Sequence, residues 1–187
     1  LQSCTLRPLF PPTLFIAHCS LLIVALNLLN LSSLPANAAN WYVNDTSTTS
    51  DSYTYAAGSD TQSGTAALPF RTIKQALDSS AAGDTIFVDA GIYDSYMTVT
   101  SEDSAGVNIT KDNITLIGKD SASTIIDPPG PNSITTMYGI YADSQQGLVI
   151  KNLAVTGAQH GIYFVNVDTS VISGDSAHSN GFAGIKL

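Results

Sequence analysis

A repeat fills residues 137–187, which read MYGIYADSQQGLVIKNLAVTGAQHGIYFVNVDTSVISGDSAHSNGFAGIKL. The pair Gly-Ile occurs at residues 139–140, 161–162 and 184–185, so the steps are 22 and then 23 residues. Each repeat consists of short β-prone runs separated by Gly, Asp, Asn or Ser. A fixed period near 22 is typical of a β-solenoid, because one coil cannot bury its apolar face without the next coil.

The same period predicts which side chains line the interior. Strands of stacked coils lie about 4.8 Å apart, so residues one period apart form columns. Ile140, Ile162 and Ile185 form one inward column, and Ile150 and Ile172 form another. No helical pattern separates the short apolar runs, so alternating βαβ units are not expected. The sequence therefore predicts an all-β fold, a parallel β-helix.

The residues before the repeat predict a cap on this solenoid. A polar stretch at 44–67 reads as a surface loop, rich in Thr, Ser, Asp and Gly. Thr72 and Gln75 match a capping box, in which each side chain reaches the backbone N–H of the other residue. Ile73, Ala76 and Leu77 share one helical face. We expect a short amphipathic helix that is stopped by Gly83.

The cap and the first coils resemble a known family. The segments PFRTIKQAL (69–77), AGDTIFV (82–88) and AGIY (90–93) look like the opening of secreted pectate-lyase-like β-helix proteins. The segments ITLIG (114–118) and TIID (124–127) continue the likeness. The resemblance implies a right-handed parallel β-helix whose short helix covers the N-terminal end, where an apolar coil and a strand edge need protection. It says less about activity, because this fold hosts many functions.

The first 38 residues have the layout of a signal peptide. An apolar run at 20–31 is followed by Ala36-Asn37-Ala38, an A-x-A cleavage site. The alternative is a transmembrane anchor, but the run is shorter than the ~20 residues that a bilayer requires. The expected organisation is a signal peptide at 1–38, an N-terminal strand, polar loop and capping helix at 39–83, and the first coils at 84–187. Because Leu187 falls in the middle of a repeat, we expect a chain truncated at its C-terminal end.

Charge and cysteine content limit the partners. The formal net charge is −8, which argues against a nucleic-acid partner because no basic surface is present to replace counterions. Both cysteines precede residue 40, so the mature part holds no disulfide. With the signal peptide removed, we expect a secreted or cell-surface protein with no membrane span. Asp89 and Asp94 flank a Gly turn and could hold calcium, although Asp at a turn more often satisfies local backbone groups.

Two classes of function remain open. The resemblance implies an enzyme on acidic polysaccharide, in which a Lys or Arg base removes a proton beside a uronate carboxylate, often with calcium as cofactor. The alternative is a non-catalytic β-helix region of a cell-surface or adhesion protein. The sequence shows no complete catalytic motif and no metal cluster, so whether the protein is an enzyme is left open.

The candidate binding residues follow the three Gly-Ile pairs. Tyr141, Tyr163 and Lys186 sit one position after the inward Ile residues, so they should point outward in one column. Tyrosine rings can stack on sugars and an ammonium can pair with a carboxylate, which suits an acidic polysaccharide. The alternative is cross-strand packing of exposed aromatics. His160 and His178 precede turns and are expected to be ordinary surface residues.

Overall fold

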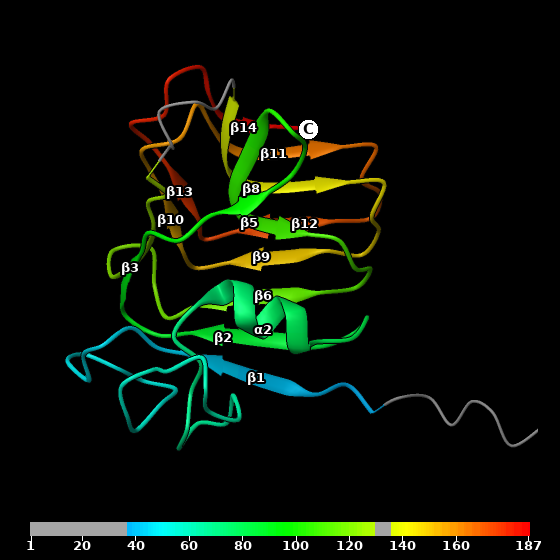
Figure 1. Ribbon diagram of the computed structural model, residues 1–187. Coiled ribbons are helices and arrows are strands. Elements are labelled where there is room, and N and C mark those ends of the chain that lie inside the picture. Colours follow the sequence, from blue (N-terminus) through cyan, green and yellow to red (C-terminus); the bar gives the residue numbers. More distant parts are fainter. Residues whose placement is uncertain (1–36, 130–135) are drawn as a thin grey trace, which may run out of the picture. The chain divides into compact units, whose positions relative to one another are not determined.

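Strands of successive coils pair side by side and form three sheets that run along the stack (Figure 1). The computed structural model describes residues 37–129 and 136–187, so nearly all of the expected signal peptide lies outside the described residues. The strands are β1 (Asn40–Val43), β2 (Thr85–Val88), β3 (Gly91–Tyr93), β4 (Met97–Thr98), β5 (Asp103–Ile109), β6 (Thr115–Gly118), β7 (Thr124–Ile126), β8 (Thr136–Asp143), β9 (Val149–Lys151), β10 (Ala154–Val155), β11 (His160–Val165), β12 (Val171–Ser173), β13 (Ser176–Ala177) and β14 (Ala183–Lys186). One helix, α2 (Ile73–Ser79), precedes the coils.

Each coil contributes one strand to each sheet. The first sheet has the order β1-β2-β6-β9-β12, the second β3-β7-β10-β13, and the third β4-β5-β8-β11-β14. All strand pairs are parallel except β4 with β5. The fold is the right-handed parallel β-helix that the repeat and the resemblance predict. In the described part of the chain, no helix is long and apolar enough to cross a membrane.

The register follows the 22-residue period. Ile162 pairs with Ile140 on one side and with Ile185 on the other, and Ile172 pairs with Ile150. Ile140, Ile150 and Ile162 are fully buried in the core between the three sheets. The inward columns therefore lie where the sequence predicts them.

The first position of each Gly-Ile pair must be glycine because a larger side chain would collide with neighbouring atoms. These glycines do not have positive φ, but a Cβ on Gly139 would lie 2.0 Å from Cγ1 of Val155 and 2.6 Å from the carbonyl oxygen of Gly161. A Cβ on Gly161 would lie 2.4 Å from the carbonyl oxygen of Gly184. The three glycines thus stack directly on one another at a corner where the backbones leave no room for a side chain.

The capping helix forms as expected at its start and differs at its end. The hydroxyl of Thr72 accepts a hydrogen bond from the Gln75 backbone N–H at 3.1 Å. Gln75 does not return the bond, because Asp60 from the polar loop accepts from the Thr72 N–H at 2.9 Å instead. The helix ends at Ser79 with Ser80 as its C-cap, four residues before the predicted stop at Gly83.

The stretch at 44–67, expected to be a surface loop, is held by hydrogen bonds to buried polar side chains. The carboxylate of Asp89 is fully buried and accepts hydrogen bonds from the backbone N–H groups of Ser52, Tyr53 and Thr54, and from the Thr54 hydroxyl. These four bonds fasten the loop to the turn that follows β2. Asn44 is also buried, with its amide donating to Ser47, Asp51 and Ala56.

Candidate functional site

The three residues predicted to form a binding column lie in register on the third sheet. Tyr163 pairs with Tyr141 in β8 and with Lys186 in β14, and Tyr141 pairs with Asn108 in β5. The column Asn108–Tyr141–Tyr163–Lys186 therefore takes one residue from each of four stacked strands. Neighbouring inward residues such as Ile140 and Ile162 are fully buried, so the column is on the outer face of the sheet.

Three more rings join this column. Tyr138 lies 4.8 Å from Tyr141 and 5.2 Å from Tyr163 between ring centroids, and the His160 ring lies 5.2 Å from Tyr163. Phe182 extends the group from the last coil, 5.5 Å from His160. We call this group of rings, together with Asn108 and Lys186, the aromatic face; its rings are Tyr138, Tyr141, His160, Tyr163 and Phe182.

Sequence reasoning missed Tyr138 and Phe182, and assigned His160 to an ordinary turn. Strict alternation places Tyr138 and Tyr141, three positions apart, on opposite faces of a strand. The alternation breaks at Gly139, where Gly139 and Ile140 both face the interior, so Tyr138 remains outside with Tyr141. The available signal was the 22-residue step from Tyr138 to His160, which pair in the structure.

The rings differ in exposure, and that decides what each can do. Tyr138 is only 9% exposed and supports the rings around it, whereas Tyr141 and Tyr163 are partly exposed. Lys186 is exposed, with its ammonium 4.6 Å from the centroid of the Tyr163 ring. A shallow pocket of about 240 Å³ borders Tyr141 and is lined also by Asn108, Asp143 and Gln145. Partly exposed rings beside polar groups are suited to binding a molecule with both apolar faces and hydroxyls.

The electrostatics of the aromatic face keep its rings neutral. Burial, and then the charge of Asp103, raise the pKa of Tyr138, while burial followed by Asp143 raises the pKa of Tyr141. Burial lowers the pKa of His160, and the positive charge of Lys186 lowers it further. The Nδ1 atom of His160 is buried and has no hydrogen-bond partner within the described part of the chain. A neutral imidazole and neutral phenols offer stacking and hydrogen bonds at pH 7, and Lys186 supplies the positive charge.

Asp89 and Asp94, which flank the Gly turn, differ in their surroundings. All four hydrogen bonds that the Asp89 carboxylate accepts come from residues 52–54, which lie 35 to 37 residues earlier in the chain and not at its own turn. Asp94 is exposed after β3. Within residues 37–129 and 136–187, no group of three or more His, Cys, Asp or Glu side chains is placed to hold a metal ion.

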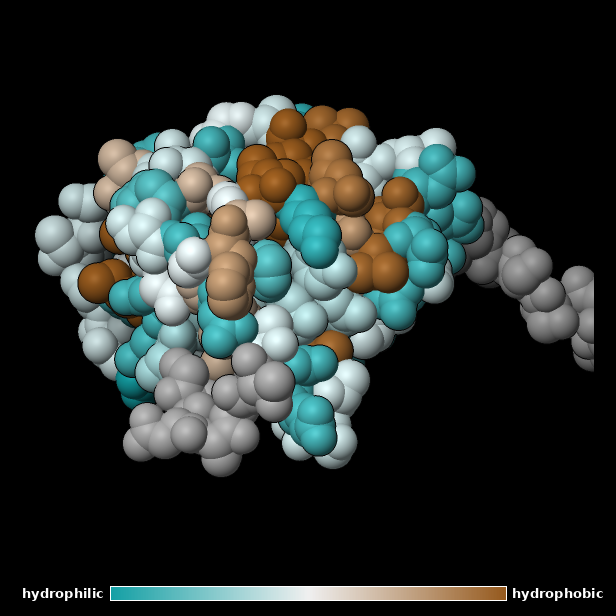
Figure 2. Space-filling model, turned by 90° about the horizontal axis from the view of Figure 1, so that it is seen from above, coloured by the Kyte–Doolittle hydropathy of each residue, from teal (hydrophilic) through white to brown (hydrophobic). Residues whose placement is uncertain are grey.

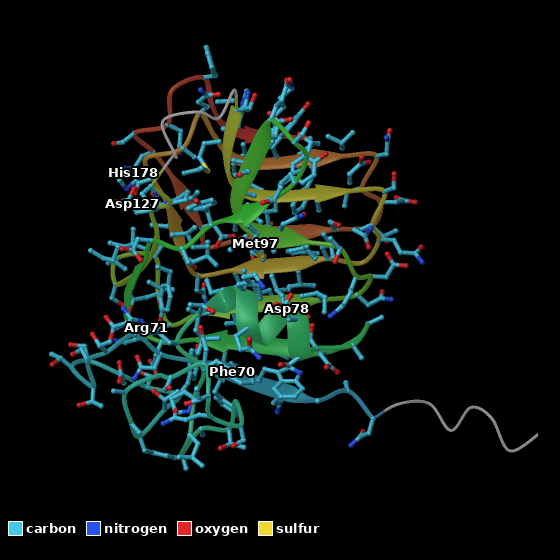
Figure 3. All side chains as sticks on the ribbon, viewed as in Figure 1. Phe70, Arg71, Asp78, Met97, Asp127 and His178 are labelled. Atoms are coloured by element: carbon cyan, nitrogen blue, oxygen red, sulfur yellow. The ribbon has the colours of Figure 1, made fainter. Side chains whose placement is uncertain are left out.

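Two other hollows lie outside the aromatic face. A groove on the second sheet is lined by Asp127 and His178, which lie on the same side of the stack at the ends of β7 and β13 (Figure 3). Its floor is the apolar side chains of Ile92, Ile125 and Ala154. No hydrogen bond joins Asp127 to His178, whose Nδ1 contacts the Ser179 hydroxyl instead. Asp127 and His178 therefore do not form a hydrogen-bonded pair in this groove.

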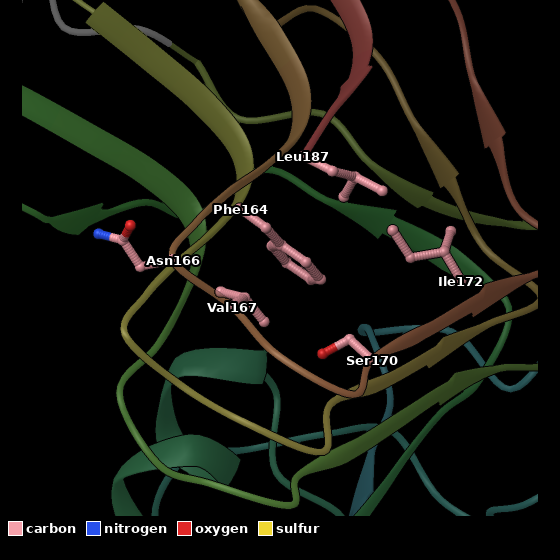
Figure 4. Close-up of a pocket in the computed structure, with 6 residues that line it drawn as sticks. All are labelled: Phe164, Asn166, Val167, Ser170, Ile172 and Leu187. Carbon is pink, nitrogen blue, oxygen red and sulfur yellow. The ribbon is translucent and has the colours of Figure 1, made fainter.

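The second hollow is at the β12–β14 end of the stack. It is lined by Phe164, Val167, Ile172 and Leu187 with two polar residues, Asn166 and Ser170 (Figure 4). Apolar atoms gather on this end when it is viewed along the stack (Figure 2). Phe164 and Ile172 belong to or pack against the core, so the hollow is the exposed interior of the last coil.

Comparisons with known proteins agree with this architecture. Residues 56–102, from the polar loop to β4, match a family described as a protein of unknown function (DUF1565). An uncharacterised protein, YwoF of Bacillus subtilis (strain 168), is 28% identical over 141 residues, which cover 69% of this chain and 28% of YwoF. The solved structure of a rhamnogalacturonan lyase superposes with a TM-score of 0.55 at 16% identity, and the match covers 75% of this chain and 37% of the lyase.

These likenesses concern part of each longer protein. The chain spans about a quarter of the length of YwoF and little more than a third of the lyase. At 16% identity, the superposition with the lyase establishes the fold and not the activity. Together with the parallel strand pairing, the superposition shows that the chain has the fold of a right-handed parallel β-helix.

Proposed function

We propose that this protein is secreted and binds acidic polysaccharide along the aromatic face of its third sheet. The observation that carries the proposal is the unbroken column of Tyr141, Tyr163 and Lys186, with the Lys186 ammonium held beside the Tyr163 ring. The two rings and the cation lie on adjacent strands, and each suits one part of a glycan that carries carboxylates. The apolar faces of sugars stack on the rings, and the ammonium attracts a carboxylate.

The spacing of the column supports an extended ligand that lies along the stack. Adjacent strands are about 4.8 Å apart, a distance similar to the length of one sugar unit. Asn108, Tyr141 and Tyr163 therefore meet successive units of a chain that runs across the strands. The polar pocket beside Tyr141 offers Asn108 and Gln145 to its hydroxyl groups.

The aromatic face favours binding over proton abstraction. Tyr138 and Tyr141 have raised pKa values and His160 a lowered one, so these three rings are neutral near pH 7 and suit stacking better than proton abstraction. The alternative activity is cleavage, since the fold is similar to that of a rhamnogalacturonan lyase. For such an activity the sequence resemblance implies calcium as the cofactor. Absorbance of unsaturated uronate products, recorded with and without calcium, separates a lyase from a non-catalytic surface or adhesion protein.

The test of binding is the variant Tyr163→Ala. Removing this ring takes away the central stacking surface, so the dissociation constant for acidic polysaccharides should rise about tenfold. Binding is measured by calorimetry with polygalacturonate, alginate and hyaluronan. The matched control is Tyr55→Ala, which removes a tyrosine that is 82% exposed on the polar loop, away from the third sheet. Equal binding by both variants would contradict the proposal.

A second pair of variants tests the charge. Lys186→Met removes the ammonium from the aromatic face, whereas Lys151→Met removes a lysine from β9 in the first sheet. Lys186→Met should lower the affinity for acidic polysaccharide, whereas Lys151→Met should leave it unchanged. The difference should be smaller at high salt, because salt screens the attraction between ammonium and carboxylate.

A further inference from the structure

One polar residue follows each strand of the second sheet. In chain order these residues are Asp94 after β3, Asp127 after β7, Thr156 after β10 and His178 after β13. The backbone N–H of Asp127 donates to the Tyr93 carbonyl oxygen at 3.1 Å, and a bond of the same kind links each later residue to the coil before it. The four residues therefore form a column, which we call the polar column, with its levels about 4.8 Å apart.

An apolar column runs beside the polar column on the outer face of the sheet. Ile92 pairs with Ile125, which pairs with Ala154. Tyr93 is buried between Ile92 and Asp94, so alternation along the strand points both of these side chains outward. The groove at this sheet has a volume of about 590 Å³, which is within the usual range for ligand pockets. We call it the second-sheet groove.

Two glycines leave room for carboxylates at the edge of this surface. A Cβ on Gly157 would lie 2.1 Å from Oδ1 of Asp127, so the Asp127 carboxylate packs against the bare backbone of the next coil. A Cβ on Gly91 would lie 2.8 Å from Oδ2 of Asp45 in the same way. Asp45 and Asp94 line a smaller hollow beside the groove. Backbone contacts therefore hold Asp45 and Asp127 in place at the edge of the surface.

The surface is negatively charged where these carboxylates gather. The second-sheet groove and the smaller hollow share Ile92, and their charged residues are Asp45, Asp94, Asp127 and Arg71. Three negative groups and one positive group give a net charge of −2, with histidine counted as neutral. Figure 3 shows Arg71 and Asp127 on the same side of the stack. None of the three carboxylates forms an ion pair with a described residue.

Two of the carboxylates occupy neighbouring levels of the polar column. Asp94 and Asp127 follow adjacent strands, and like charges on adjacent strands repel each other. A positive group between them removes this repulsion and is attracted by both. Ile92 and Ile125 lie on the same two strands, so this position is apolar on one side. The matching group is therefore a cation with an aliphatic part.

A lysine side chain has both properties. Its four-carbon stem can cover apolar surface while its ammonium reaches the carboxylates. A calcium ion fits less well, because it takes about six to eight oxygen ligands and gains nothing from aliphatic side chains. Within the part of the chain that the structure describes, no three His, Cys, Asp or Glu side chains are placed to hold a metal ion.

We infer that the second-sheet groove binds a lysine-containing peptide segment of a partner protein. The lysine ammonium lies between Asp94 and Asp127, and its aliphatic stem covers Ile92. The rest of the segment continues toward Thr156 and His178, where the polar column offers hydrogen-bonding groups and no carboxylate. A polyamine carries ammonium groups along its whole length and leaves some of them without an acid. A peptide in which uncharged residues follow the lysine matches the pattern.

The experiment compares two peptides on the full chain at low ionic strength. The probe is the dye-labelled, capped peptide Lys-Leu-Ser-Gly, and its control carries Nε-acetyl-lysine, which keeps the aliphatic stem and loses the charge. Fluorescence anisotropy measures both dissociation constants. We expect the acetylated peptide to bind about threefold to tenfold more weakly, because it loses two exposed ion pairs.

Matched variants test the charge and the apolar column separately. Asp127→Asn should weaken binding of the lysine peptide and leave the acetylated peptide unchanged. Its control Glu102→Gln removes an exposed carboxylate outside the groove and should change neither. Ile92→Thr should weaken binding of both peptides, because Ile92 is 60% exposed and lines the groove. Val171→Thr alters a side chain of the first sheet that is 46% exposed and should weaken neither.

The outcomes decide between a peptide and other occupants of the groove. Equal binding of the two peptides, or equal effects of Asp127→Asn and Glu102→Gln, overturns the inference. Displacement of the lysine peptide by an equal concentration of cadaverine or of calcium overturns it as well, because the occupant is then a small cation. The groove is on a different sheet from the aromatic face, so each of these results leaves the proposed binding of acidic polysaccharide unaffected.

Discussion

The first coil and the last described coil differ in what covers them. At the N-terminal end, α2 packs Ile73, Ala76 and Leu77 onto the core, and the segment at 64–70 hydrogen-bonds along β1. The antiparallel strand β4 covers the edge of β5. At the other end, β12, β13 and β14 each have one partner among the described strands. Ile185 there is 47% exposed, although its column mates Ile140 and Ile162 are fully buried.

This difference shows that burial in a solenoid depends on neighbours rather than on residue type. The same isoleucine position is core in one coil and surface in the next, because a coil covers its column only when another coil or a cap lies on it. Among the described coils, stability should therefore be concentrated between α2 and β11, where a coil or the cap lies on both sides. Variants at equivalent positions in different coils can test this comparison directly.

The largest effect is expected from isoleucine replacements within one column. Ile162→Ala leaves a cavity in the closed part of the core and should lower the free energy of unfolding by about 2–5 kcal/mol. Ile185→Ala removes a half-exposed side chain from the open end and should cost less than about 1 kcal/mol. Urea denaturation followed by circular dichroism measures both, and equal losses would remove the distinction between the two ends.

The glycine corner gives the next largest effect. A Cβ on Gly139 would overlap Val155 and the Gly161 backbone, so Gly139→Ala should lower the free energy of unfolding by about 1–3 kcal/mol. The control is Gly181→Ala, where the added Cβ meets nothing closer than 3.7 Å and φ is not in the left-handed region. A thermal melt should show a clear loss for the first variant and almost none for the second. An unchanged melting temperature for Gly139→Ala would contradict the crowding that the structure shows at this corner.

These positions also show what could be predicted from the sequence. The 22-residue step predicted the registers of Ile140, Ile162 and Tyr163, because in a stacked coil the period alone decides which residues are neighbours. The pairing of Tyr141 with Tyr163 and Lys186 follows from the same rule.

The parts that the sequence could not predict depend on contacts outside the period. Asp89 binds backbone groups 35 to 37 residues earlier, in a loop that belongs to no repeat. The inclusion of Tyr138 in the aromatic face depends on the break in alternation at Gly139, which follows from three-dimensional crowding. Helix α2 ends early because Ser80 is its C-cap and because Lys111, at the start of the next coil, binds Ser80. The Lys111 ammonium donates a hydrogen bond to the Ser80 carbonyl oxygen, with 2.7 Å between the two atoms.

A smaller, pH-dependent effect should mark the capped end. Burial alone would raise the pKa of Asp84, but hydrogen bonds from Ala81, Trp41 and Ala39 outweigh it and hold the pKa below its ordinary value. The resulting stabilisation is fully present above the unfolded-state pKa of about 3.9 and is lost as pH falls through the lower folded-state value. Asp84→Asn should therefore lower stability by about 1 kcal/mol at pH 7 and by less near pH 2. A constant difference between the variants at all pH values would contradict this assignment.

The smallest effect is a lowered pKa of His160 in the aromatic face. Burial and Lys186 lower the pKa of His160, and protonation would bury an Nδ1–H that has no acceptor in the described structure. Since the folded-state pKa is depressed, any stabilisation from neutral His160 is present above about pH 6.5 and is lost as pH falls through the lower value. Histidine resonances recorded by NMR should show His160 titrating below the ordinary histidine pKa of about 6.5. Titration at or above that value would argue against a buried imidazole in the aromatic face.

The central claim is that acidic polysaccharide binds along the aromatic face, and tyrosine ring resonances test it most directly. The protein labelled at tyrosine is titrated with hyaluronan and with polygalacturonate while its NMR spectrum is recorded. We expect the signals of Tyr141 and Tyr163 to shift in step with saturation and the signal of Tyr55 on the polar loop to stay in place. Unchanged Tyr141 and Tyr163 signals at saturating polymer, with or without a shift at Tyr55, would contradict the claim.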